Sequence, residues 1–201
     1  MKTKYLTIIF LCLSVAVLLG CARGRTKTSA GLARPAGSDI RADVVRKISS
    51  RVIGDIPSTG RLETVKKRGI LRVALPPQEP PFQSLDPAMN LPVGFNTALV
   101  SEIALILEVK PNITILERQP DLSSYPTDWA DKYDLIFLDG PAGACPRNQG
   151  IAYFYNGAAA GWKTICAADP NAALSSAVKE ILVYLNETGI FAQLYRTHVI
   201  K

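Results

Sequence analysis

Two loops carry residues that could bind a small polar or anionic molecule. The loop Pro76–Phe82 and the loop Asp139–Arg147 each follow a short apolar segment typical of a buried strand. The second loop is rich in glycine (Asp139-Gly140-Pro141-Ala142-Gly143), and its backbone N–H groups near the Arg147 cation would suit a carboxylate. A tight turn beside a surface arginine has the same composition, so both interpretations stay open.

The sequence lacks the residue sets of common hydrolytic and metal sites. His198 is the only histidine and lies near the C-terminus, which argues against Ser-His-Asp or Cys-His chemistry and against a zinc site. Asp128, Asp131 and Asp134 could be paired carboxylates, but their position around Trp129 favours a solvated turn. We therefore expect a protein that is not an enzyme and that uses no metal or cofactor.

The N-terminal segment has the pattern of an export signal. Lys2 and Lys4 precede an apolar run over residues 5–19, which is too short for a typical spanning helix. It ends in Leu-Leu-Gly-Cys, which resembles the lipobox of bacterial lipoproteins. That resemblance implies a signal peptide over residues 1–20, lipidation of Cys21, and anchoring on the periplasmic side of a bacterial membrane. Ala22 slightly favours the outer membrane.

The remaining cysteines fit an exported protein. Cys12 leaves with the signal peptide and Cys21 is the lipidation site, so Cys145 and Cys166 remain as an even pair. Such a pair in an exported chain predicts a disulfide. Two unpaired buried thiols are the alternative.

The net charge of +6 is concentrated at the N-terminal end of the chain. Residues 60–201 hold 13 basic and 14 acidic residues, which argues against a nucleic-acid-binding domain. Residues 21–59 form a basic tether, with a linker composition up to residue 37 and an amphipathic pattern over residues 39–53. The basic face of that helix comprises Arg41, Lys47 and Arg51. It could lie on anionic lipid or in a partner's groove, or the helix could pack on its own domain.

Residues 60–201 have the pattern of an α/β domain. Strands alternate with amphipathic helices, which predicts a mostly parallel sheet with helices on both faces. The strands are expected over residues 70–75, 113–116, 134–138, 151–155 and 162–167, and the helices over residues 61–68, 95–107, 170–189 and 191–197. Ligands of such sheets bind at the carboxyl ends of the strands, where the two loops lie.

Several motifs in this region resemble the family 3 solute-binding proteins, the amino-acid-binding components of ABC importers. They extend in the family's order over about 140 residues. They are the segment Leu62–Ala74, Glu79-Pro80-Pro81-Phe82 (P-P-F loop), Gly94-Phe95-Asn96 (G-F-D), Lys132-Tyr133-Asp134 (G-K-Y-D), Arg147 with Ile151–Phe154 (T-x-x-R…V-D-F-S), and the ending Asp169–Tyr195.

The resemblance implies a ligand site and also a reduced architecture. Arg147 matches the family's carboxylate-binding position, and Phe82 is also retained. Glu79 stands where an aromatic residue is common, and Ala144 replaces a threonine. Residues 157–162 join two strands almost directly where the family has a second lobe. The lobe that supplies an acidic residue for the ligand's ammonium group is therefore expected to be missing.

Two functions follow from this pattern. The loss of a lobe favours a membrane-anchored, non-catalytic accessory or scaffold subunit that docks on an envelope protein complex. The alternative is the substrate-binding component of an amino-acid-type ABC importer, with a small carboxylate as its ligand at Glu79, Phe82, Asp139, Gly140 and Arg147.

Overall fold

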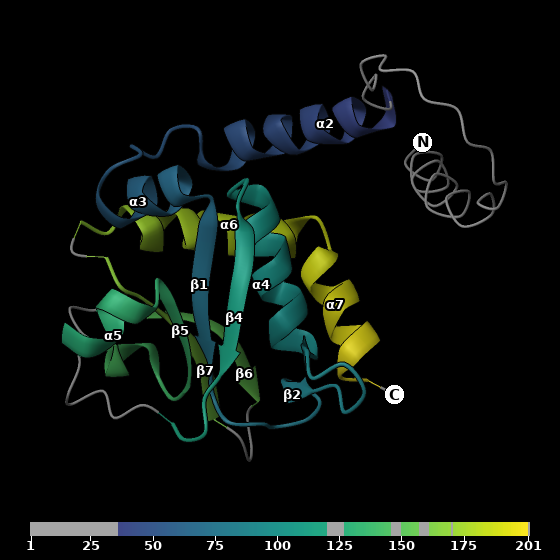
Figure 1. Ribbon diagram of the computed structural model, residues 1–201, viewed down its shortest axis with the longest axis vertical. Coiled ribbons are helices and arrows are strands. Elements are labelled where there is room, and N and C mark those ends of the chain that lie inside the picture. The colour runs from purple at the N-terminus through teal and green to yellow at the C-terminus, as the bar shows by residue number, and fades with distance from the viewer. Residues whose placement is uncertain (1–35, 120–126, 146–149, 157–160, 170, 201) are drawn as a thin grey trace, which may run out of the picture. The chain divides into compact units, whose positions relative to one another are not determined.

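The computed structural model describes residues 36–119, 127–145, 150–156, 161–169 and 171–200. Helices and strands alternate along most of this chain (Figure 1). In chain order the elements are α2 (Ala36–Ile53), α3 (Gly60–Arg68), β1 (Ile70–Leu75), β2 (Ser84–Leu85), β3 (Pro92–Val93), α4 (Phe95–Ile106), β4 (Lys110–Ile115), α5 (Thr127–Lys132), β5 (Leu135–Asp139), the 3-10 turn η2 (Ala142–Ala144), β6 (Gly150–Asn156), β7 (Gly161–Ala167), α6 (Ala173–Glu187) and α7 (Ile190–His198).

Five strands form the central sheet in the order β4-β1-β5-β7-β6. β1 pairs in parallel with β4 and β5, whereas β7 is antiparallel to both β5 and β6. The expectation of a mostly parallel sheet is confirmed, with β7 as the reversed strand. This reversal places the start of β7 at the same edge as the carboxyl ends of β1 and β5.

Side chains alternate between the two faces of the sheet, as the period of a strand requires. On β1 and β5, Leu71, Val73 and Phe137 enter the larger apolar core, which α3, α4 and α6 cover. Ala74 and Ile136 point to the smaller core on the other face, where Trp129 of α5 packs. Helices therefore cover both faces, as expected from the sequence.

Helix α2 packs against α4 and α6 of the domain. Ile53 is buried, and Ile48 and Val52 pack against the larger core, so burial of this apolar stripe holds the helix in place. The sequence allowed three positions for this helix: on anionic lipid, in a partner's groove, or packed on its own domain. The structure supports packing on the domain. The compact unit begins at Ala36 instead of residue 60, and the helix starts before the expected residue 39.

The described part of the chain contains no helix with the length and apolar character needed to cross a membrane. Residues 1–35, including the expected signal peptide and Cys21, lie outside the described residues.

Two local expectations were wrong. Helix α6 begins at Ala173, later than the expected start next to Asp169, although the Asp169 carboxylate accepts hydrogen bonds from the backbone N–H groups of Asn171 and Leu174 (3.1 and 2.5 Å). Asp134 is fully buried and does not lie on a solvated turn.

Three arginines neutralise the buried Asp134 carboxylate. Arg61 and Arg72 approach it at 3.6 and 3.4 Å, and Arg68 also forms an ion pair with it. The backbone N–H of Arg72 donates to the same carboxylate at 2.8 Å. This cluster ties α3 and β1 to the start of β5.

Candidate ligand-binding crevice

The start of α4 fixes the loop that follows β1. The backbone N–H groups of Phe95 and Asn96 donate to the carbonyls of Pro81 and Phe82, at 3.1 and 2.8 Å. Gly94 precedes them with φ of 112°, and a Cβ there would lie 2.7 Å from the Phe82 carbonyl oxygen. Only glycine allows this approach, so the motif Gly94-Phe95-Asn96 sets the position of the loop.

Three of the residues expected in the ligand site converge on Lys163 at the carboxyl edge of the sheet. Asp139 is the last residue of β5 and lies opposite Lys163 on β7. The Lys163 Nζ lies 2.6 Å from Asp139 Oδ1, forms an ion pair with Glu79 Oε2, and lies 4.6 Å from the Phe82 ring centroid. The lysine side chain is 2% exposed, whereas the Glu79 and Asp139 side chains are 41% and 35% exposed.

A buried chain of hydrogen bonds holds the loop that carries Glu79 and Phe82. The Tyr153 hydroxyl donates to Asn96 Oδ1 at 2.8 Å, and Asn96 Nδ2 donates to Gln83 Oε1 at 2.6 Å. Gln83 Nε2 then donates to the Pro77 carbonyl at 2.9 Å, so the chain links β6 through α4 to the loop after β1.

The environment of Tyr153 reflects the negative charge at this edge. Burial raises the pKa of the Tyr153 hydroxyl well above its ordinary value, and the charges of Asp139 and Glu79 raise it further. The hydrogen bond to Asn96 acts in the opposite direction. Tyr153 therefore stays protonated and serves as a donor to Asn96.

The glycine-rich loop after β5 is fastened to β7. The Gly140 carbonyl accepts a hydrogen bond from Thr164 Oγ1 at 2.6 Å. Cys145 and Cys166 form the disulfide expected from the sequence, with their Cα atoms 5.6 Å apart. The backbone N–H groups of Ala144 and Cys145 donate to the carbonyls of Pro141 and Ala142, at 2.9 and 3.1 Å, and so close the turn η2.

The structure therefore brings together Glu79, Phe82 and Asp139, with Gly140 next to them. Arg147 lies outside the described residues. Sequence reasoning missed Lys163, although a lysine inside the otherwise apolar strand 162–167 was a signal for a buried charge. Of the expected basic face on α2, Lys47 and Arg51 are exposed, and the side chain of Arg41 lies outside the described part.

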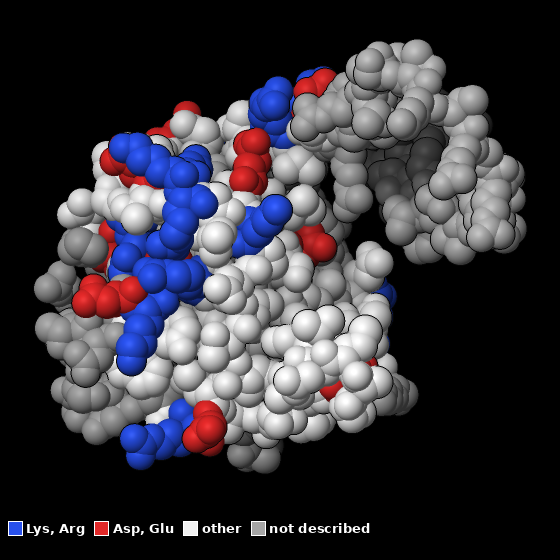
Figure 2. All heavy atoms as spheres, in the orientation of Figure 1, with Lys and Arg blue, Asp and Glu red and all other residues white. Residues whose placement is uncertain are grey.

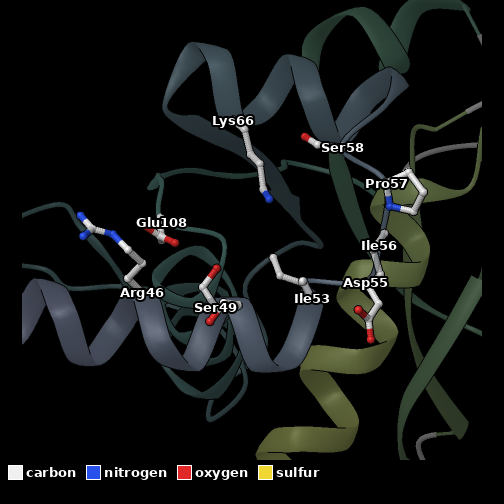
Figure 3. A pocket seen from close by; sticks show the side chains of 11 residues that line it. Arg46, Ser49, Ile53, Asp55, Ile56, Pro57, Ser58, Lys66 and Glu108 are labelled. Atoms are coloured by element: carbon white, nitrogen blue, oxygen red, sulfur yellow. The ribbon is translucent and has the colours of Figure 1, made fainter.

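A hollow lies near the amino ends of β1 and β4, away from the Lys163 cluster. It has a volume of about 480 Å³ and is lined by α2, the segment after it, and α3. Figure 3 shows Lys66 reaching toward it from α3, with Glu108 at its side. Its charges are mixed, and nothing about it selects a ligand.

Basic side chains gather on the side of the molecule where α3 lies (Figure 2). Figure 2 shows Lys and Arg in a band over the region of α3 and α5, interrupted by acidic groups. The last turn of α3 carries Lys66, Lys67 and Arg68, whose positive charges interact favourably with the negative end of the helix dipole. Part of this basic character thus stabilises the helix, and Arg68 also neutralises Asp134.

No family model and no curated protein matches the chain. Solved structures do match. Arginine-bound domain 1 of TmArgBP, in a point-mutant form, shares 24% identity with a TM-score of 0.51, over 63% of this chain and 98% of that one. A mutant of ArgBP from T. maritima shares 15% identity with a TM-score of 0.55, over 70% and 100%.

An amino acid ABC transporter substrate-binding protein from Streptococcus pneumoniae, bound to L-arginine, gives 16% identity and a TM-score of 0.54, over 70% and 98%. At these identities the similarity establishes the fold. The similarity covers 63–70% of this chain, and it agrees with the order of the family-like motifs along the sequence. The body of this protein therefore has the fold of a lobe of the amino-acid-binding periplasmic proteins of ABC transporters.

Proposed function

We propose that this protein is a lipid-anchored, non-catalytic binding lobe on the periplasmic side of a bacterial membrane, with a small amino-acid-type molecule as its ligand. The observation that carries the proposal is the convergence of Glu79 and Asp139 at the carboxyl edge of the sheet. Both carboxylates are partly exposed and share the single Lys163 cation, so this group of three carries a net charge of −1.

An α-ammonium group would be attracted to the exposed sides of these carboxylates. Glu79 and Asp139 would then take the place of the acidic residue that binds the ammonium group in the family and that is expected to be lost with the second lobe. The ligand's carboxylate would bind Arg147, the position that the family resemblance implies. The backbone of the loop Asp139–Gly140 would set the distance between the two ends of the ligand.

The structural neighbours support a single lobe as a sufficient binding unit. Domain 1 of TmArgBP is described in its arginine-bound form, so a lone lobe of this fold holds an amino acid in that protein. Burial of a ligand by one lobe is less complete than by two, and we expect a lower affinity per ligand atom for that reason.

An accessory subunit docking on an envelope protein complex is the second candidate. It is favoured by Lys163, which already neutralises much of the acidic charge in the crevice. In that case the crevice would be a structural remnant, and the protein would use its surface to contact a neighbouring subunit.

Isothermal titration calorimetry of the full-length protein in detergent, against a panel of α-amino acids, separates the two functions. We expect one class of amino acid to bind, and Asp139→Asn to weaken it at least about tenfold, the typical effect of removing a charged hydrogen-bond acceptor. Glu187→Gln, an exposed carboxylate at the end of α6, is the matched control and should bind like the wild type. Absence of binding across the panel, with co-purification of a membrane complex, would favour the accessory role.

The anchor has its own test. Intact-mass measurement of the protein extracted from membranes should show a chain that starts at Cys21 and carries acyl groups, and Cys21→Ala should remove them. A chain that retains residues 1–20 would contradict the proposed processing.

A further inference from the structure

Lys163 is a buried cation at the point where the proposed ligand site lies. Its side chain is 2% exposed, although a lysine on a strand end would ordinarily extend into solvent. A buried ammonium group is stable only when it is paired, and here Glu79 and Asp139 supply the pairing from two different segments.

The groups around Lys163 Nζ form the kind of site that holds a cationic ligand group. Two carboxylates provide charge, and the face of Phe82 lies 4.6 Å from the nitrogen, within the range of a cation–π interaction. Phe82 is itself fixed by edge-to-face contacts with Phe95 and Phe154, at centroid distances of 6.1 and 5.5 Å. The aromatic face is therefore rigid, and it is already covered by this chain's own ammonium group.

We infer that Lys163 is a resident cation that fills a cation subsite formed by Glu79, Asp139 and Phe82 and thereby sets the ligand class. The exposed sides of the two carboxylates would take the ligand's α-ammonium group, whereas a cationic side chain would have to compete with Lys163 for their buried sides and for the ring. This inference rests on the proposed function, and it specifies the ligand as an amino acid whose side chain carries no cation. The structural neighbours described with arginine bind a ligand whose side chain carries the cation itself.

Removing the resident cation should open the subsite to free cations. Lys163→Ala removes the three outer methylene groups and the ammonium group, which together correspond to propylammonium. We expect this variant to have a lower Tm than the wild type and to regain several degrees, saturably, in millimolar propylammonium chloride. Lys163→Met keeps most of the side-chain volume without the charge, so propylammonium should restore little of its Tm.

Two controls separate the subsite from general salt effects. Propanol at the same concentration lacks the charge, and sodium chloride lacks the apolar part, so neither should restore the Tm of Lys163→Ala. A Tm shift by propylammonium that is equal in the wild type and in both variants would overturn the inference, because Lys163 would then only link the loop to the sheet.

A second variant keeps the test valid if Lys163→Ala does not fold. Lys163→Ala combined with Glu79→Gln leaves one unpaired carboxylate instead of two, with Asp139 and the Phe82 ring still in place. We expect propylammonium to raise its Tm saturably as well, and no response to propylammonium would overturn the inference.

Calorimetry tests the ligand class directly. The wild type should bind arginine and lysine at least tenfold more weakly than its preferred amino acid, and Lys163→Ala should reduce that difference. Wild-type binding of arginine as tight as that of uncharged amino acids would overturn the inference while leaving the proposed function intact. If no amino acid binds the wild type, the proposed function fails, and the propylammonium experiment alone decides whether the cation subsite exists.

Discussion

Replacing Ile53 by alanine tests whether α2 is part of the folded body. Ile53 is 3% exposed at the end of α2, and the substitution removes three carbon atoms from the core. Their transfer from the interior to water costs about 2.4 kcal/mol at 0.8 kcal/mol for each group. Ile53 also lines the hollow of about 480 Å³, so the space left behind is open to water and adds little further cost. We expect a loss of about 2.5 kcal/mol, near the low end of the usual range for buried aliphatic residues.

Val44→Ala on the same helix is the matched control. Val44 is 51% exposed, and alanine has the higher helix propensity, so its effect should stay within about 0.5 kcal/mol. Urea unfolding followed by tryptophan fluorescence and by circular dichroism measures both free energies of unfolding. Equal stabilities for the wild type and Ile53→Ala would refute the packing of α2, and the helix would then belong to the tether and not to the folded domain.

Three further predictions concern stability. Cys145→Ala with Cys166→Ala should lower the free energy of unfolding by about 3 kcal/mol, since the disulfide closes a loop with a sequence separation of 21, and reductant should destabilise the wild type similarly but not the variant. Asp134→Ala should cost about 3–5 kcal/mol in urea unfolding because three arginines lose their shared counter-ion, whereas the exposed Asp131→Ala should cost far less. Glu102→Gln should stabilise the protein at pH 7, because burial raises the pKa of this carboxyl group in the folded state; since the group is only partly buried and solvent screens it, the gain should stay below about 0.5 kcal/mol. That gain should disappear as the pH falls below the ordinary value of 4.5, where the wild-type carboxyl group is protonated in both states; a gain independent of pH would contradict the assignment.

Much of the fold could be predicted from apolar periodicity. The expected strand at residues 70–75 matches β1, and the helix from Phe95 follows from its repeating apolar face. The reversal of β7 could not be predicted, because a buried strand has the same apolar composition in either direction. Helix α5 was also missed, since Thr127–Lys132 is too short and polar to show a helical period.

The candidate site was only partly predictable for a different physical reason. Glu79, Phe82 and Asp139 were identified through their loops and the family resemblance, and the structure brings them together. Lys163 joins them because β7 runs against β5, a pairing that sequence spacing does not reveal. The hydrogen-bond chain from Tyr153 to Gln83 also depends on contacts between distant segments.

Hydrogen–deuterium exchange of the full-length protein, with and without its amino acid ligand, tests the central claim most directly. If the crevice binds the ligand, exchange should slow in peptides covering residues 76–83, 139–145 and 161–164 and remain unchanged in α2 and α3. Slowed exchange confined to α3 and the basic band, or to the outer edge of β6, would contradict a ligand site at the carboxyl edge of the sheet.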